Sequence, residues 1–238
     1  MISVTQHEVM TVGGLGFLFI LYSVWMGQMC AKDLPDGYDN PVLALELVKN
    51  GADIKAIVGP KDGKVHNFLK QSTYKDFGYI LVYTVFFVLL SLLLSRMNFS
   101  WAGWAGWLAA ACAIFGAVLD LIEDRGMLKA ISGEASNTLA DNIRYPSLAK
   151  WSFLFLFSLL VGLLLIARRN LFVIPAVCFL LAGLCGLIGV VRNFLLPKFY
   201  PLFPAALGLL GFGIIILAVA FIFAPEKILT KFPPLESG

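Results

Sequence analysis

Six long apolar stretches, set apart by polar segments, dominate the hydropathy pattern of this chain. They cover residues 12–30, 77–95, 101–122, 150–167, 171–191 and 202–223. A helix needs about 20 mostly apolar residues to cross the hydrocarbon core of a bilayer. The pattern therefore predicts an all-α integral membrane protein, built as a bundle of about six transmembrane helices.

The polar segments divide the chain into four regions. Residues 1–30 hold the N-terminal tail and the first transmembrane helix, 31–76 form a polar, interfacial helical insertion, 77–224 form a five-helix transmembrane bundle, and 225–238 form a flexible tail. Residues 64–76 are expected to be helical and continuous with the second span.

Two short helices are expected inside the insertion. Asn40, which a proline follows, is a typical N-cap, and Asn50-Gly51 is a typical C-terminal stop, so the first helix should lie between them. A second helix should cover 53–58. Both have one apolar side, with Glu46 expected on the polar side, and this pattern suits helices that lie at a membrane surface.

The distribution of positive charge predicts the orientation. Thirteen of the 18 Lys and Arg residues would lie on the side of the insertion and the other five on the side of the termini. Loops rich in Lys and Arg stay in the cytoplasm. We therefore expect a protein of the cell or inner membrane with both termini non-cytoplasmic and the insertion cytoplasmic.

Small residues indicate which helices should pack closely. The third, fifth and sixth spans carry small residues four positions apart, such as Gly106 and Ala110, and such pairs let helix backbones approach in lipid. These three spans should form a tight centre. The fourth span, with Phe153, Phe155 and Phe157, should face lipid or a partner.

Composition narrows the function classes. The chain is 59% apolar and 14% charged, with a net charge of only +3. A basic run interleaved with aromatics is lacking, which disfavours nucleic acid as a partner and leaves membrane lipids and other membrane chains. No ionisable residue falls near the middle of an expected span, which disfavours a proton-coupled pump. No cofactor is evident, although a pigment, quinone or lipid could be held by packing alone.

One charged cluster stands out, at the end of the third span. Asp120, Glu123 and Asp124 share one helix face, and carboxylates at a helix C-terminus oppose the helix dipole. Either a divalent cation or basic residues on the same side should compensate them. The basic candidates are Arg125, Lys129, Arg144, Lys150 and Arg192. Of these, Arg144 and Arg192 join the three acids in a hypothetical ligand or ion-pair cluster.

A weaker polar stripe runs down the second span from the same side. It consists of Asp76, Tyr79 and Tyr83, which could line a shallow pocket beneath the insertion. Tyrosines whose hydroxyls bond to a neighbouring backbone carbonyl are the commoner arrangement.

Three function classes remain. The first is a non-catalytic multi-pass membrane subunit or scaffold, such as an accessory part of a larger membrane complex, because no catalytic motif is present. The second is a membrane enzyme that acts on a lipid or isoprenoid head group at the cytoplasmic face, with the acidic cluster on a metal and Arg144 or Arg192 on phosphate. The third is a carrier of small amphipathic molecules. The sequence favours the first.

Overall fold

Most of the residues that the structure describes are helical. The computed structural model describes residues 4–27, 29, 34, 39–97, 100–167, 172–195 and 202–230. Its helices are α1 (Gln6–Met26), α2 (Pro41–Glu46), α3 (Gly51–Val58), α4 (Lys64–Ser95), α5 (Ala102–Ile131), α6 (Asn137–Ile166), α7 (Val173–Leu195), α8 (Leu202–Phe223) and α9 (Pro225–Leu229). Six of them, α1 and α4 to α8, are long and apolar enough to cross a membrane. The prediction of a six-span helical membrane protein is confirmed.

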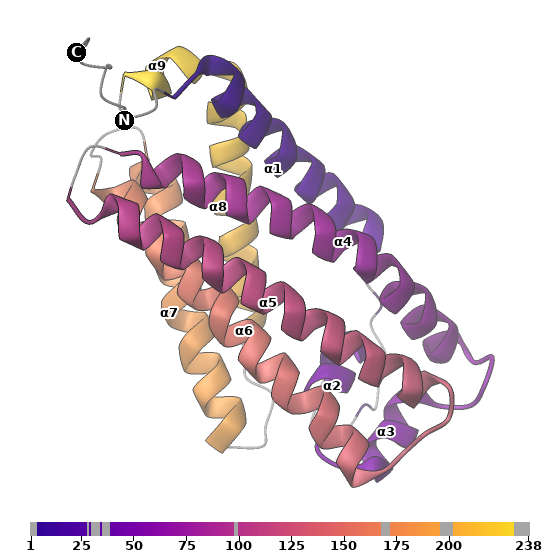
Figure 1. The fold of residues 1–238 in the computed structure, drawn as a ribbon. Coiled ribbons are helices and arrows are strands. Elements are labelled where there is room, and N and C mark those ends of the chain that lie inside the picture. The colour runs from indigo at the N-terminus through magenta and orange to yellow at the C-terminus, as the bar shows by residue number, and fades with distance from the viewer. Residues whose placement is uncertain are drawn as a thin grey trace.

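The six long helices form a closed ring. Each packs against the next long helix in the chain, and α8 packs against α1. The start of α1 and the short α9 lie together at one end of the bundle, while α2 and α3 lie at the opposite end (Figure 1). Which end faces the cytoplasm stays a prediction.

Three of the long helices are longer than the hydrocarbon core of a bilayer is thick. At 1.5 Å per residue, helices of 30 to 32 residues such as α4, α5 and α6 are about 45 Å long, whereas the hydrocarbon core is about 30 Å thick. Together with α2 and α3, the adjoining ends of α4, α5 and α6 form what we call the helical cap. The cap has its own apolar core, which includes Leu45, Val48, Ile54, Ile57, Leu69, Met127 and Ile143.

In the cap, the helix boundaries at Asn50 and Gly51 differ from the sequence prediction. Helix α2 ends at Glu46, and Asn50 is the N-cap of α3, not the end of the first helix. Gly51 is then the first residue of α3, and its backbone N–H donates to Asn137 Oδ1 at 3.0 Å. A Cβ on Gly51 would lie 3.0 Å from the backbone of Ser136. The glycine therefore allows α3 to touch the start of α6.

The fourth span is more buried than predicted. Of its most apolar 18-residue window, 56% of the residues are buried, against 39% for the last span, α8. Phe155 and Phe157 are fully buried, and the Phe155 ring lies directly against Gly186 of α7. This helix was expected to face lipid or a partner, but Phe155 packs against Gly186 of α7 and Phe157 stacks on Phe87 of α4, so much of it faces the bundle.

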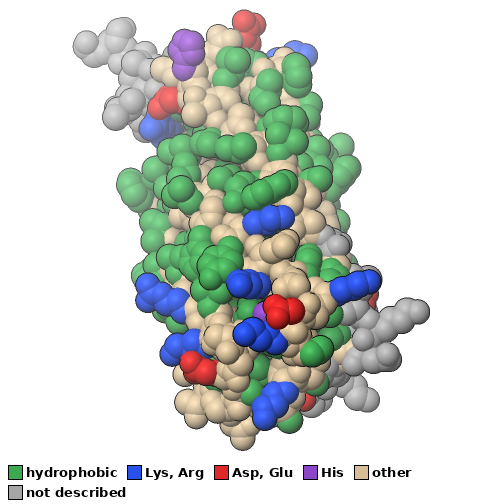
Figure 2. All heavy atoms as spheres, turned by 90° about the vertical axis from the view of Figure 1, so that its right-hand side faces the viewer, with side chains coloured by type: hydrophobic (Ala, Val, Ile, Leu, Met, Phe, Trp, Pro, Cys, Tyr) green, Lys and Arg blue, Asp and Glu red, His purple; other side chains and the backbone are tan. Residues whose placement is uncertain are grey.

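The outer surface suits a bilayer. On α7, Leu184, Ile188 and Val191 are each more than half exposed, and similar apolar side chains project from the other long helices. Figure 2 shows a broad band of hydrophobic side chains between charged side chains at the top and a larger group of Lys and Arg below.

Candidate functional site

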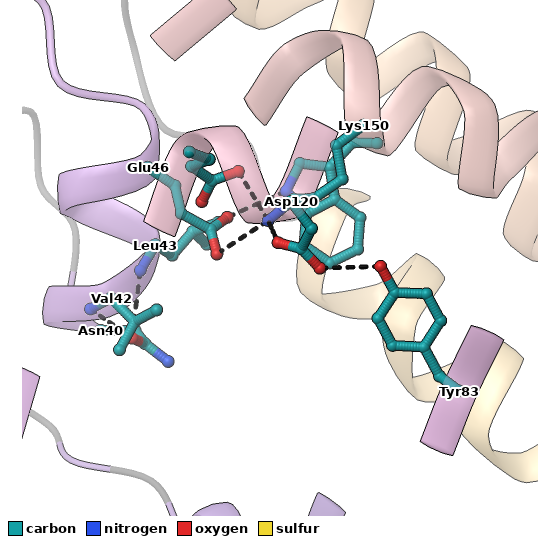
Figure 3. Close-up of polar contacts among 9 residues, drawn as sticks. Asn40, Val42, Leu43, Glu46, Tyr83, Asp120 and Lys150 are labelled. Carbon is teal, nitrogen blue, oxygen red and sulfur yellow. Dashed lines mark hydrogen bonds and ion pairs between the residues drawn. The ribbon is translucent and has the colours of Figure 1, made fainter. Parts of the chain in front are cut away.

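A buried group of charged side chains lies where the helical cap meets the bundle. Its centre is Lys150, near the midpoint of α6, with a side chain that is only 3% exposed. The ammonium lies 2.8 Å from Asp120 Oδ1, 2.8 Å from Glu123 Oε2 and 3.4 Å from Glu46 Oε1. We call these four residues the ion-pair cluster (Figure 3).

The contacts within the cluster differ in kind. Lys150 donates a hydrogen bond to Asp120 and a longer one to Glu46. Its contact with Glu123 is an ion pair by distance, but the angle does not make a hydrogen bond. Since the α5 carboxylates lie three residues apart on one helix face, a single ammonium can reach both.

Glu46 brings the insertion into the cluster. Asn40 caps α2 by accepting hydrogen bonds from the backbone N–H groups of Val42 and Leu43, at 2.9 and 3.3 Å. The short helix that follows ends at Glu46, whose Oε2 accepts a hydrogen bond from Trp151 Nε1 at 2.9 Å. Glu46 is therefore buried against α6, and the expectation that it lies on an exposed polar side is wrong.

Tyr83 extends the cluster into α4. Its hydroxyl donates to Asp120 Oδ2 at 2.8 Å, so this carboxylate has a partner on each oxygen (Figure 3). Its neighbour Tyr79, one turn away, shares a hydrogen bond with Ser23 of α1 at 3.1 Å. Both tyrosines of the predicted stripe thus have side-chain partners, while Asp76 lies half-buried on the same helix. That these residues line a pocket stays a prediction.

Asp124 lies beside the cluster and differs from it. It is 1% exposed, and neither carboxylate oxygen has a hydrogen-bond partner among the described residues. A buried carboxylate without a partner is costly. Because Lys150 already faces three acids, its single positive charge does not also compensate Asp124.

The structure selects one of the five basic candidates that the sequence offered. Lys150 contacts the acids, whereas Arg144 Nη2 donates to the backbone carbonyl of Asn193 at 2.9 Å, and Arg192 is an exposed residue of α7. Arg144 therefore binds a backbone carbonyl, and Lys150 is the candidate that contacts the acids. Glu46 and Trp151 are members of the site that sequence reasoning missed. A sequence signal for Glu46 exists, since apolar residues surround it on both sides.

The metal hypothesis gains no support from the geometry. In the part of the chain that the structure describes, no group of three or more His, Cys, Asp or Glu side chains is arranged to hold a metal ion. The position between the acids is occupied by the ammonium of Lys150.

Comparison of the chain with protein-family models, with curated proteins and with solved structures found no match. The fold and the site therefore define the class on their own. This is a multi-pass helical membrane protein in which a buried lysine ties the short helix α2 to the long helices of the bundle.

Proposed function

We propose that this protein is a non-catalytic multi-pass membrane subunit, and that its helical cap is the surface that docks a partner chain. The observation that carries the proposal is the pinning of Glu46. Lys150 and Trp151 bind this carboxylate from α6, so α2 is held at a fixed place on the bundle. A preformed surface binds a partner at a lower entropic cost than a loose segment does.

The packing of the cap supports the same proposal. Its apolar core joins α2 and α3 to α4, α5 and α6, and it continues to Val190 of α7 and Phe203 of α8. Its outer surface carries exposed charged residues such as Lys55, Arg125 and Asp141, which suit the polar rim of an interface.

The burial of the acids favours a subunit over an enzyme. Asp120, Glu123 and Asp124 are each at most 5% exposed, so a lipid head group has no direct access to them. Large aromatic side chains such as Phe157 and Phe179 fill the bundle, and this packing favours a subunit over a carrier.

A crosslinking experiment tests the proposal. A photo-crosslinking residue is placed at an exposed cap position, Lys55 or Asp141, and at a lipid-facing control position, Ile188. Cells are illuminated, and the full-length protein is extracted in mild detergent. We expect the two cap positions to crosslink to the same partner chain, and a native mass that exceeds that of a single chain.

Two results would contradict it. The first is a native mass equal to one chain, with no crosslink from either cap position. The second is a chemical activity of the wild-type protein on lipid head groups that is lost in the Asp120→Ala and Glu123→Ala variants. Such an activity would favour the enzyme.

A further inference from the structure

A second polar feature lies on the cap, away from the ion-pair cluster. It is a pocket of about 480 Å³ between the end of α3, the first half of α4 and the end of α5. Its polar lining includes Lys61, His66, Lys70, Tyr74 and Ser132. We propose that this basic pocket binds the phosphate of an anionic phospholipid head group.

The two lysines are available for a ligand. Both Lys61 and Lys70 are exposed, and neither ammonium has an ion pair or hydrogen bond among the described residues. Ammonium groups that converge on one pocket attract phosphate, whose oxygens accept charge-assisted hydrogen bonds.

The lysines are also not needed to cap the neighbouring helix. The last carbonyls of α5 already have donors: Ser132 N to Leu128 O, Gly133 N to Ala130 O, Glu134 N to Lys129 O, and His66 to Ile131 O. The usual role of a lysine near a helix C-terminus is thus filled by other groups.

His66 forms the buried wall of the pocket. It is 7% exposed, and its Nε2 lies 3.1 Å from the carbonyl oxygen of Ile131. A carbonyl only accepts, so Nε2 carries the hydrogen, and Nδ1 has no partner within the described parts of the chain. The pocket wall therefore holds a buried polar atom that a ligand could contact.

Along α4, Tyr74 and Lys70 lie at about the depth of the lipid head-group layer. The apolar run of this helix starts at Phe77, so Tyr74 lies about 5 Å and Lys70 about 10 Å outside it, at 1.5 Å per residue. The head-group region extends about 5–8 Å beyond the hydrocarbon core, and a lysine side chain spans the remaining distance. Tyr74 is 58% exposed, as expected for a tyrosine at the membrane interface. The end of the pocket at Tyr74 and Lys70 therefore lies at the level of the head groups, while His66 and Lys61 lie farther from the hydrocarbon core.

The test compares two double variants that lose the same charge. Lys61→Ala with Lys70→Ala removes both pocket lysines, and Lys55→Ala with Lys64→Ala removes two exposed lysines of the same cap that do not line the pocket. Purified, delipidated protein is titrated with phosphatidylglycerol, with phosphatidylcholine and with inorganic phosphate, and bound ligand is counted by native mass spectrometry.

We expect the pocket variant to bind phosphatidylglycerol about tenfold or more weakly than the wild type. Each lysine near an anionic lipid adds electrostatic attraction, and this variant loses two of them. The control variant should change by less than about twofold, and Lys61→Arg with Lys70→Arg should keep most of the binding. Equal unfolding temperatures without ligand show that the comparison is between folded proteins.

Three results would overturn the proposal. Equal losses in the two alanine variants would show that general surface charge attracts the lipid. Equal binding of phosphatidylcholine would show that the phosphate of an anionic lipid is not selected. Inorganic phosphate that binds as tightly as the lipid and displaces it would assign the pocket to a soluble phosphate compound.

Discussion

Lys150 on α6 lies 2.8 Å from Asp120 on α5, and the two buried groups meet where the membrane-spanning bundle gives way to the helical cap. Thirty residues separate them in the chain, so the pair forms only when α5 and α6 pack side by side. Glu46, more than 100 residues before Lys150, joins the same ammonium. One lysine thus ties together three separate parts of the sequence.

Removing this lysine should destabilise the protein strongly. Lys150→Met keeps the length and apolar stem of the side chain but leaves buried carboxylates without their cation, which costs about 3–5 kcal/mol. With about 2–4 °C per kcal/mol for a chain of this size, the unfolding temperature in detergent should fall by roughly 10 °C. Thermal unfolding of the purified protein measures the change.

A compensated variant separates charge from packing. When Lys150→Met is combined with Asp120→Asn and Glu123→Gln, the lysine charge and the two nearest carboxylate charges are removed together, and Glu46 keeps its hydrogen bond from Trp151. Part of the lost stability should therefore return. An unfolding temperature of Lys150→Met equal to that of the wild type would show that the ion-pair cluster does not stabilise the fold.

Loss of the Glu46 carboxylate should release the insertion. In Glu46→Ala, Trp151 Nε1 loses its acceptor and Lys150 loses one of its partners, so α2 and α3 should open more often. Hydrogen exchange followed by mass spectrometry should show faster exchange across 41–58, with little change in α8. Lys55→Ala, at an exposed position of α3, is the matched control.

An exchange rate that does not change in Glu46→Ala would contradict this prediction. If exchange in 41–58 is unchanged by Glu46→Ala, then the apolar core of the cap alone holds the insertion, and the docking proposal loses the observation on which it depends.

Much of this architecture could be predicted from hydropathy, because lipid imposes one simple rule on each span. The start of α4 at Lys64 and its continuity with the second span followed from the same pattern. The three acids of α5 were found because their spacing of three and four residues is a local feature. Their partner was one of five basic candidates, since only the packing of α5 on α6 decides which one reaches them.

Two sequence predictions, for Asn50-Gly51 and for the phenylalanines of α6, differ from the structure for the same physical reason. Asn50-Gly51 was interpreted from its local preference as a helix stop, but the contact of Gly51 with Ser136 determines its role. The phenylalanines of α6 were expected to face lipid or a partner, but Gly186 of α7 makes room for Phe155, and Phe157 stacks on Phe87 of α4. In both cases a contact between distant segments overrides what a single helix suggests.

The contact between α6 and α7 leads to a prediction on packing. Gly186→Ala would place a methyl group into the Phe155 ring, so the protein should lose about 1–3 kcal/mol of stability. Gly208→Ala is the control, because a Cβ there meets no atom within 4 Å and should be neutral or slightly stabilising. Thermal unfolding of both variants gives the comparison, and equal effects would show that the two helices do not pack through Gly186.

Labelling of single cysteines tests the orientation of the chain. In a variant whose native cysteines are replaced by alanine, Ser132→Cys reports on the cap end of the bundle and Thr230→Cys on the end beside α9, since both positions are exposed. Because Lys and Arg are concentrated on the cap side, and positively charged loops stay in the cytoplasm, Thr230→Cys should react with an impermeant maleimide in intact cells. Ser132→Cys should react only after the membrane is opened. Reaction of Ser132→Cys alone in intact cells would reverse the orientation. Equal reaction of both would contradict the count of spans, because three spans, α6, α7 and α8, separate the two positions, and an odd number of crossings places them on opposite sides.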